Sequence, residues 1–279
     1  MTKLKRLRGK RLALTLFMIA LAILFLMPLA WMISSSLKLA GEVFSPNFHW
    51  FSEIIRFDNY LKVWTNPDVP FWRSFLNSAI ISDSVVVGQL IVSSLAAYAF
   101  AKIRFKGRNI VFLLMLMTMM IPTQALIIPR YMLFYQLGIY DNLLCMILPN
   151  FFNVTSIFLL RQFYMGLPDE LVEAARIDGA GHFRIWLQIM MPLTKNGLIS
   201  AAILAFINSW NEYLTALVFL PSNQNYTTAM AVRWYLLDPA REYNLMMCAA
   251  ASTIVPVIVL YITFQKYFED GVASSGVKG

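Results

Sequence analysis

Polar residues that could bind a substrate interrupt one of the apolar stretches of this sequence. Asn208, Asn211, Glu212 and Thr215 all lie within the stretch 197–220. In a continuous helix, their i, i+3, i+4 and i+7 spacing would place them on one face. Amide and carboxylate groups suit hydroxyl-rich substrates, and an ionisable residue inside a membrane is a functional candidate by default. The alternative is hydrogen bonding between helices, worth about 0.6 kcal/mol on average, and the residues leave both roles open.

A second ionisable residue, Asp83, lies in the apolar stretch 75–101. Four small or amide side chains of this stretch form a polar stripe, namely Ser78, Ser82, Gln89 and Ser93. Small polar residues are common where membrane helices meet, so the stripe predicts a packing seam. Asp83 lies off the stripe, where it could pair with another helix or face a transport pathway. The candidate substrate contacts are therefore Asp83 and the four polar residues of 197–220.

Residue types for catalysis and metal binding are scarce. The apolar stretches contain no nucleophile–base set and no paired carboxylates, so an intramembrane enzyme is the least favoured class. The sequence has two histidines, and Cys145 and Cys248 lack CxxC spacing, so neither a metal site nor a disulfide framework is expected. The G-x-x-x-x-G-K-[ST] phosphate loop is also missing, so we expect no ATP hydrolysis by this chain and no cofactor in it.

The composition assigns the chain to the membrane class. Hydrophobic residues make up 59% of it and charged residues 14%, whereas soluble domains have about 45–50% and about 25%. A helix needs roughly 20 residues to cross a bilayer. Six stretches meet this requirement: 12–33, 75–101, 110–129, 142–160, 197–220 and 246–265. Pro122, Pro149 and Pro256 lie within them and predict kinks. The expected fold is all-α and polytopic, with six transmembrane helices.

The Lys and Arg residues predict the orientation of these helices. With the N-terminus in the cytoplasm, 16 of the 23 basic residues lie in inside segments and the other 7 lie outside. This bias favours both termini in the cytoplasm. It also accounts for the net charge of +8 without a nucleic-acid partner. We expect a cytoplasmic N-terminal segment 1–11, a six-helix permease domain 12–265 and a cytoplasmic C-terminal tail 266–279.

A polar segment, 161–196, separates two of the apolar stretches on the predicted cytoplasmic side. Pro168 suits the first turn of a helix, and the acidic residues that follow favour its N-terminal dipole. This helix is expected over 169–178 and to end at Gly179, since glycine readily adopts the left-handed conformation after a helix. A second helix is expected over 182–191, ending at Pro192. The sequence therefore predicts a helix, a tight turn and a second helix.

The charge of the first of these helices favours a protein partner. It carries four acidic residues and one basic residue, namely Asp169, Glu170, Glu173, Asp178 and Arg176. An amphipathic helix on a membrane surface has a basic polar face, and an acidic helix does not lie against an anionic leaflet. The small side chains of Ala174 and Ala175 would let a partner approach closely. Glu173 and Asp178 would accept its hydrogen bonds.

The spacing of this loop resembles a motif of a known family. The chain reads Glu-Ala-Ala at 173–175, Gly179 after three more residues, and Ile-Met-Met-Pro at 189–192 after another nine. This is similar to the EAA loop of ABC importer permeases, with Met191 as the one departure, where leucine is usual. Other segments resemble the carbohydrate permeases of the maltose or oligosaccharide type, in particular the shorter six-span subunit: 77–109, 120–149, 209–217 and 264–279. The resemblance begins near residue 12.

The resemblance implies a complete set of partners. It implies docking to a dimeric ATPase, and this partner would bind the ATP and Mg²⁺. The residues of this chain that would make the contact are Glu173, Ala174, Ala175, Asp178, Gly179 and Ala180. It also implies a homologous second permease subunit, an extracytoplasmic solute-binding protein, a sugar substrate and the cytoplasmic membrane of a prokaryote. The tail would insert at the ATPase interface, whereas the small polar residues of 273–279 by themselves predict a frayed end.

Two alternatives remain at this point. An ion-coupled secondary transporter is disfavoured, since that class often has internal repeats and none is visible in this sequence. Such a transporter would also have no need of the acidic helix. A permease of the same family for another solute, such as glycerol phosphate, is compatible with every motif above.

Overall fold

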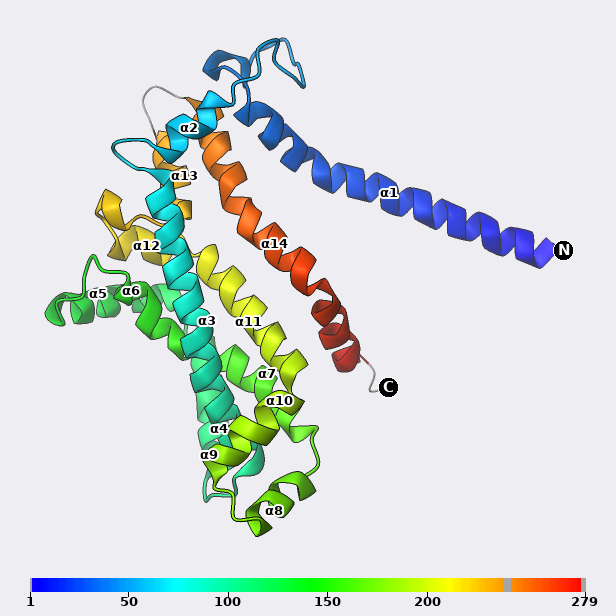
Figure 1. Cartoon of the computed structure of the whole chain (residues 1–279), viewed down its shortest axis with the longest axis vertical. Helices are drawn as coiled ribbons and strands as arrows, with labels where there is room; N and C mark the ends of the chain where they lie inside the picture. The colour runs from blue at the N-terminus through cyan, green and yellow to red at the C-terminus, as the bar shows by residue number, and fades with distance from the viewer. Residues whose placement is uncertain (1, 238–241, 277–279) are drawn as a thin grey trace. The chain divides into compact units, whose positions relative to one another are not determined.

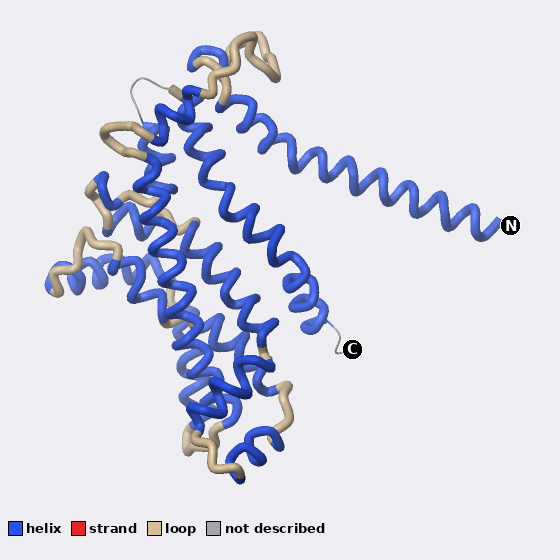
Figure 2. The backbone as a smooth tube through the Cα atoms, viewed as in Figure 1, coloured by secondary structure: helices blue, strands red, loops and turns tan. Residues whose placement is uncertain are grey.

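All regular structure in the computed structural model is helical across the described residues, 2–237 and 242–276 (Figures 1 and 2). The helices are α1 Thr2–Ser36, α2 Asp58–Trp64, α3 Phe71–Lys102, α4 Arg108–Met117, α5 Ile127–Gln136, α6 Leu144–Ile147, α7 Val154–Met165, α8 Glu170–Ile177, α9 His182–Ile185, α10 Met191–Leu193, α11 Lys195–Trp210, α12 Leu214–Phe219, α13 Thr228–Leu237 and α14 Tyr243–Gly276. Short 3-10 and π turns link several of them. The all-α prediction is confirmed.

Helices of membrane-spanning length and composition account for most of the predicted spans. Within the described residues, four helical segments qualify alone: Lys10–Ser36, Phe71–Lys102, Leu144–Met165 and Tyr243–Lys266. Two further helix pairs are sharply bent, and counting each pair as one span raises the number to six. The polytopic class is therefore confirmed, but two of the six candidate spans are bent helix pairs rather than single continuous helices.

The predicted span 110–129 is broken at Pro122. The helical segments Arg108–Met120 and Thr123–Gln136 meet there at 90°. Proline lacks the N–H that would continue a helix, and it drives the preceding residue out of the helical region. Ile121 accordingly has φ −79° and ψ 116°, an extended conformation. The kink predicted at this proline is confirmed as a complete break.

The predicted span 197–220 is also interrupted, because α11 ends at Trp210 and α12 begins at Leu214. The Asn211 side-chain amide donates to the Ile207 carbonyl at 2.8 Å, and the Glu212 carboxylate accepts the Thr215 N–H at 2.8 Å. These polar side chains compete with backbone hydrogen bonds at the break. The prediction that Asn208, Asn211, Glu212 and Thr215 share one face of a continuous helix is therefore wrong.

The other prolines have smaller effects. Pro149 lies in the 3-10 turn Leu148–Phe151 between α6 and α7, whereas α14 continues across Pro256. The tail differs from the frayed end that its composition predicted, since α14 extends to Gly276. Residues 277–279, the last part of that prediction, lie outside the described residues.

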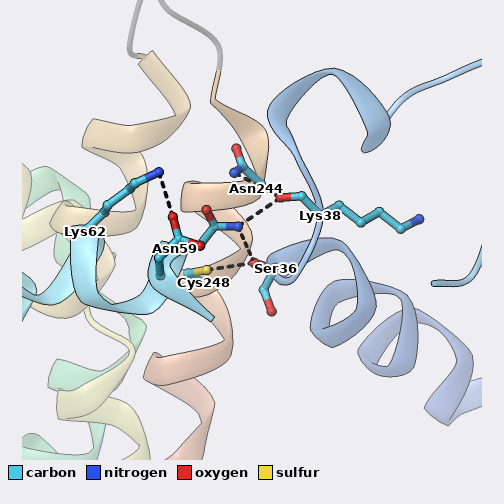
Figure 3. Close-up of polar contacts among 7 residues, drawn as sticks. Ser36, Lys38, Asn59, Lys62, Asn244 and Cys248 are labelled. Carbon is cyan, nitrogen blue, oxygen red and sulfur yellow. Dashed lines mark hydrogen bonds and ion pairs between the residues drawn. The ribbon is translucent and has the colours of Figure 1, made fainter. Parts of the chain in front are cut away.

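The chain divides into two units, which are described separately: Met1–Phe71 with Ala231–Ile254, and Trp72–Met230 with Val255–Gly279. In the first unit, side chains from α2 and α14 satisfy the carbonyls of the last residue of α1, Ser36, and of Lys38 just beyond it (Figure 3). Asn59 donates to the Ser36 and Lys38 carbonyls, both at 2.9 Å, and Asn244 donates to the Lys38 carbonyl at 3.2 Å. The Cys248 thiol donates to the Ser36 carbonyl at 3.1 Å. The last carbonyls of a helix need such partners.

In the second unit, Asp141 joins the connection between α5 and α6 to the segment after α12. Its N–H donates to the Phe219 carbonyl at 3.1 Å, and its carboxylate accepts from the Ser222 N–H at 3.3 Å and from the Ser222 hydroxyl. The Asn225 amide donates to the Asp141 carbonyl at 2.6 Å. Asp141 has a φ of +56°, which non-glycine residues rarely adopt. These contacts offset the cost of that conformation.

Candidate functional site

The predicted docking segment folds as helix α8 followed by a left-handed turn (Figure 1). Gly179 has a φ of +82°; its N–H donates to the Arg176 carbonyl at 3.0 Å, and the Ala180 N–H donates to the Ala175 carbonyl at 2.9 Å. This pair of bonds defines a Schellman motif, which satisfies carbonyls at the end of a helix. The predicted helix end is confirmed, and a side chain at position 179 would strain the backbone.

The second helical stretch of the loop is less regular than expected. It comprises α9, a π turn over Trp186–Met190, and α10. It continues through Pro192 to Leu193, so the expected end at Pro192 is wrong. Pro192 lies in the first turn of α10, where the missing N–H costs little. The stretch then meets α11 at an angle of 85°.

The inner face of α8 packs into the apolar core of the second unit. Val172 and Ala175 are 7% and 8% exposed. They belong to a buried cluster with Tyr164 of α7, and with Ile185 and Trp186 of the second helical stretch. The same cluster includes Ala97 and Tyr98 of α3 and Met190. Helix α8 is thus packed against the elements that precede and follow it.

Buried polar side chains reinforce this packing. The Trp186 indole N–H donates to the Ser94 hydroxyl at 2.6 Å, and that hydroxyl is 2.9 Å from the Tyr164 hydroxyl. The Tyr98 hydroxyl is 3.0 Å from His182 Nδ1. Buried Tyr and Trp usually have such polar partners, which is the sequence signal that could have indicated this network. The bonds join α3 to α7 and to the helical stretch that follows Gly179.

Lys102, at the end of α3, holds the start of the predicted docking segment. Its side chain is 3% exposed, its ammonium group donates to the Leu167 carbonyl at 2.6 Å, and it also pairs with the Asp169 carboxylate. The hydrogen bond from Lys102 lowers the pKa of Asp169. Sequence reasoning counted Lys102 only as a charge that orients the chain, because its partners lie 65 and 67 residues away.

The outer face of α8 carries most of the predicted docking residues. Glu173, Ala174, Asp178 and Gly179 are exposed, Ala180 is partly buried, and Ala175 lies on the inner face. Ala175 therefore serves the packing of α8, whereas Ala174 leaves the backbone open to a partner. Ile177 is an apolar side chain that is 87% exposed at the end of this helix.

A hollow of about 390 Å³ adjoins α8 in the second unit. Its walls come from the end of α3, from α8 and from the start of α9, and they carry both charge signs. The lining residues are Lys102, Ile103, Arg104, Asp169, Val172, Glu173, Arg176 and His182. The predicted docking residue Glu173 therefore faces a mixed-charge concave surface, which could receive protruding side chains of a partner protein.

Two of the predicted substrate contacts line a separate cavity of about 100 Å³, where the break at Pro122 meets the break between α11 and α12. Its lining residues are Thr123, Gln124, Ile127, Arg130, Glu212, Leu214, Thr215 and Phe219. Helix α12 packs on α5 beside this cavity, with the Phe134 and Phe219 ring centroids 5.1 Å apart. Asn208 and Asp83 are exposed elsewhere on α11 and α3, and Asn211 caps α11. The structure thus groups Glu212 and Thr215 but not the other three.

Sequence reasoning missed Arg130, Gln124 and Thr123 as neighbours of Glu212. The sequence places Thr123 and Gln124 at the end of the predicted span 110–129 and Arg130 directly after it. The bend at Pro122 turns the segment Thr123–Gln136 by 90°, which brings α5 against α12. Polar residues on both sides of a proline in an apolar stretch were the available signal.

Comparison with known proteins gives consistent matches. Residues 89–274 match the family described as binding-protein-dependent transport system inner membrane component. The chain is 34% identical over 271 residues to the arabinooligosaccharides transport system permease protein AraQ of Bacillus subtilis (strain 168), covering 96% of each chain. It is 35% identical over 224 residues to the sn-glycerol-3-phosphate transport system permease protein UgpE of Escherichia coli (strain K12), covering 78% of this chain and 80% of the relative.

A solved structure has the same fold. It belongs to a bacterial ABC transporter involved in the import of the acidic polysaccharide alginate. The TM-score is 0.81 at 26% sequence identity, and the match covers 94% of this chain and 97% of the other.

Proposed function

Because the chain belongs to the family of binding-protein-dependent transport system inner membrane components and is a permease subunit of an ABC importer, we propose that it forms a sugar pathway together with a homologous second permease. The relative that aligns over 96% of its length is named for arabinooligosaccharides, and the solved structure belongs to an importer of a polysaccharide. Both names favour an oligosaccharide substrate. The glycerol-phosphate relative supports a non-sugar solute as the second candidate.

The proposed contact with the ATPase is the outer face of α8. The observation that carries this proposal is the contrast between the two faces of the helix. Val172 and Ala175 are buried in the core, whereas Glu173, Ala174 and Asp178 are exposed beside a mixed-charge hollow. A helix that is firmly packed on one side and open on the other can transmit a displacement that a flexible loop would absorb.

The coupling follows from these attachments. Closure of the ATPase dimer would move α8. The Lys102–Asp169 pair would pass this movement to α3, and the buried cluster around Tyr164 would pass it to α7. ATP and Mg²⁺ would bind to the ATPase, so this subunit would contribute movement and a pathway but no chemistry. A solute-binding protein would deliver the substrate at the opposite side of the membrane.

Gly179→Trp tests the docking proposal. A side chain at a φ of +82° distorts the turn after α8, so the variant should insert normally but lose co-purification of the ATPase and ATP-driven uptake. Gly41→Trp is the matched control, since Gly41 has open space around it and no positive φ. Unchanged ATPase retention and uptake in Gly179→Trp would contradict the proposal. Uptake driven by an ion gradient without ATP would favour a secondary transporter instead.

A further inference from the structure

We infer that the cavity between α5 and α12 is a subsite for hydroxyl groups of an uncharged sugar, in which Arg130 donates hydrogen bonds and Glu212 accepts them. This inference rests on the proposed function and narrows its substrate class. Three observations support it: the position of the cavity at two helix breaks, the balance of its charges, and its size.

The two helix breaks indicate that the cavity belongs to a solvated pathway. Backbone that is not helical is tolerated at membrane depth only where protein buries it or where it lines a water-filled cavity. The chain is broken next to Pro122 and again at Asn211–Tyr213, and residues directly after both breaks line this one cavity. Two breaks about 90 residues apart therefore meet at one polar cavity in a largely apolar part of the protein.

The charges in the cavity favour a neutral polar ligand. Arg130 supplies a guanidinium group, and Glu212 supplies a carboxylate that already accepts the Thr215 N–H at 2.8 Å. Thr123, Gln124 and Thr215 add only neutral donors and acceptors. A guanidinium has donors alone and an ionised carboxylate has acceptors alone, so together they match hydroxyl groups, which do both. A phosphate or uronate group would gain from Arg130 but would be repelled by Glu212.

The volume of the cavity limits which part of a sugar can enter it. A volume of about 100 Å³ accommodates a few water-sized groups. The cavity can therefore take hydroxyl groups from the edge of a sugar ring while the rest of the oligosaccharide lies outside it. A contact of this kind would select for hydroxyl arrangement and charge rather than for the length of the sugar chain.

The experiment uses the complete transporter, with both permeases, the ATPases and the binding protein, in proteoliposomes. The probes are arabinotriose, an alginate trisaccharide and sn-glycerol-3-phosphate. We expect the wild-type protein to import arabinotriose in preference to the two anions. Glu212→Gln and Arg130→Met should each lower arabinotriose uptake about tenfold or more, as expected when a hydrogen bond to a charged group is lost. Glutamine retains an oxygen that can cap α12.

A charge-specific readout separates binding from a structural role. Glu212→Gln should raise the ratio of alginate-trisaccharide uptake to arabinotriose uptake, because it removes the repulsion but keeps the helix cap. ATPase co-purification should stay at the wild-type level in both variants. Glu53→Gln, a change of an exposed carboxylate outside the cavity, should match the wild-type protein in every assay.

Three results would overturn the inference. Preferential wild-type import of either anion, or unchanged uptake and selectivity in both variants, would exclude a subsite for neutral sugars while leaving the importer assignment intact. ATP-dependent import of none of the three probes would refute the proposed function, and the inference would fail with it.

Discussion

At the scale of single residues, Lys102 connects helix α3 to the predicted docking segment. Its side chain is nearly buried, while its partner Asp169 is 64% exposed. Solvent therefore screens the ion pair, and the hydrogen bond to the Leu167 carbonyl holds the ammonium group in place independently of it. Loss of the carboxylate should weaken this connection without breaking it.

Asp169→Asn should lower the stability of the protein by at most about 1 kcal/mol at pH 7, the usual limit for an exposed pair. Because Lys102 lowers the pKa of Asp169 in the folded protein, the pair stabilises the fold above the ordinary aspartate pKa of about 3.9. This contribution disappears as the pH falls through the lowered value. Thermal unfolding in detergent at pH 7 and pH 3 measures the difference. Glu170→Gln is the control, and a deficit of Asp169→Asn that is as large at pH 3 as at pH 7 would count against the pairing.

Asp141 allows a test of backbone strain. Replacement by Ala removes the bonds to Ser222 and leaves a methyl-bearing residue at a φ of +56°, a conformation that costs about 1–3 kcal/mol for residues other than Gly. Replacement by Gly removes the same bonds but relieves the strain, and Asn tolerates this conformation. Thermal stability should therefore fall least for Asn, more for Gly and most for Ala. Equal losses for Gly and Ala would show that the backbone is not strained.

At the scale of helices, two glycines allow close packing in the second unit. A Cβ atom on Gly197 of α11 would lie 2.5 Å from the Phe163 ring, and one on Gly88 of α3 would lie 2.2 Å from the Phe151 ring. Small residues permit close approach of helices in membranes, where dispersion contacts replace the hydrophobic driving force. At these two positions, the absence of a side chain leaves room for the phenyl ring of a neighbouring segment.

Gly197→Ala should destabilise the protein by about 1–3 kcal/mol, the usual cost of overpacking. Gly41→Ala is the matched control, because no atom lies within 4 Å of the added Cβ position. Thermal unfolding and the yield of monodisperse protein in detergent measure the effect. If both alanine variants behave alike, the Phe163 ring moves aside easily and the contact does not limit packing.

Local signals explain which helices could be predicted. The end of α8 followed from Gly179 alone, and the break after α4 followed from Pro122, since each residue acts on its own backbone. The break between α11 and α12 was missed because hydropathy averages over 197–220, whereas the break depends on side-chain bonds made by Asn211 and Glu212. A polar residue in an apolar stretch can be a helix cap as well as a site.

At the scale of the whole molecule, the membrane class, the helical fold and the helix-turn-helix shape of the loop 161–196 could be derived from composition, charge and turn residues. The grouping of Arg130 with Glu212 could not, since it depends on a 90° bend whose angle the sequence does not specify. The attachment of α8 through Lys102 likewise depends on where distant helix ends meet. Local chemistry was predictable, and long-range placement was not.

The orientation of the chain remains a prediction based on its basic residues. An epitope tag inserted beside Phe51, which is 77% exposed, should bind antibody on intact spheroplasts. A tag inserted beside Lys106, in the exposed turn before α4, should bind only after permeabilisation. Each protein must retain ATP-dependent uptake for its tag to count. The reverse accessibility pattern would place the docking segment outside the cell and exclude an ATPase partner.

Both cysteines of the chain are buried. Cys145 and Cys248 are 1% and 0% exposed, and their thiols donate to the Ile139 and Ser36 carbonyls. A maleimide therefore has no access to either sulfur while the fold is intact. Spin or fluorophore labels can therefore be attached to introduced cysteines without first removing the two natural ones. Reaction of Cys248 with maleimide would report opening of the first unit, and reaction of Cys145 would report opening of the second.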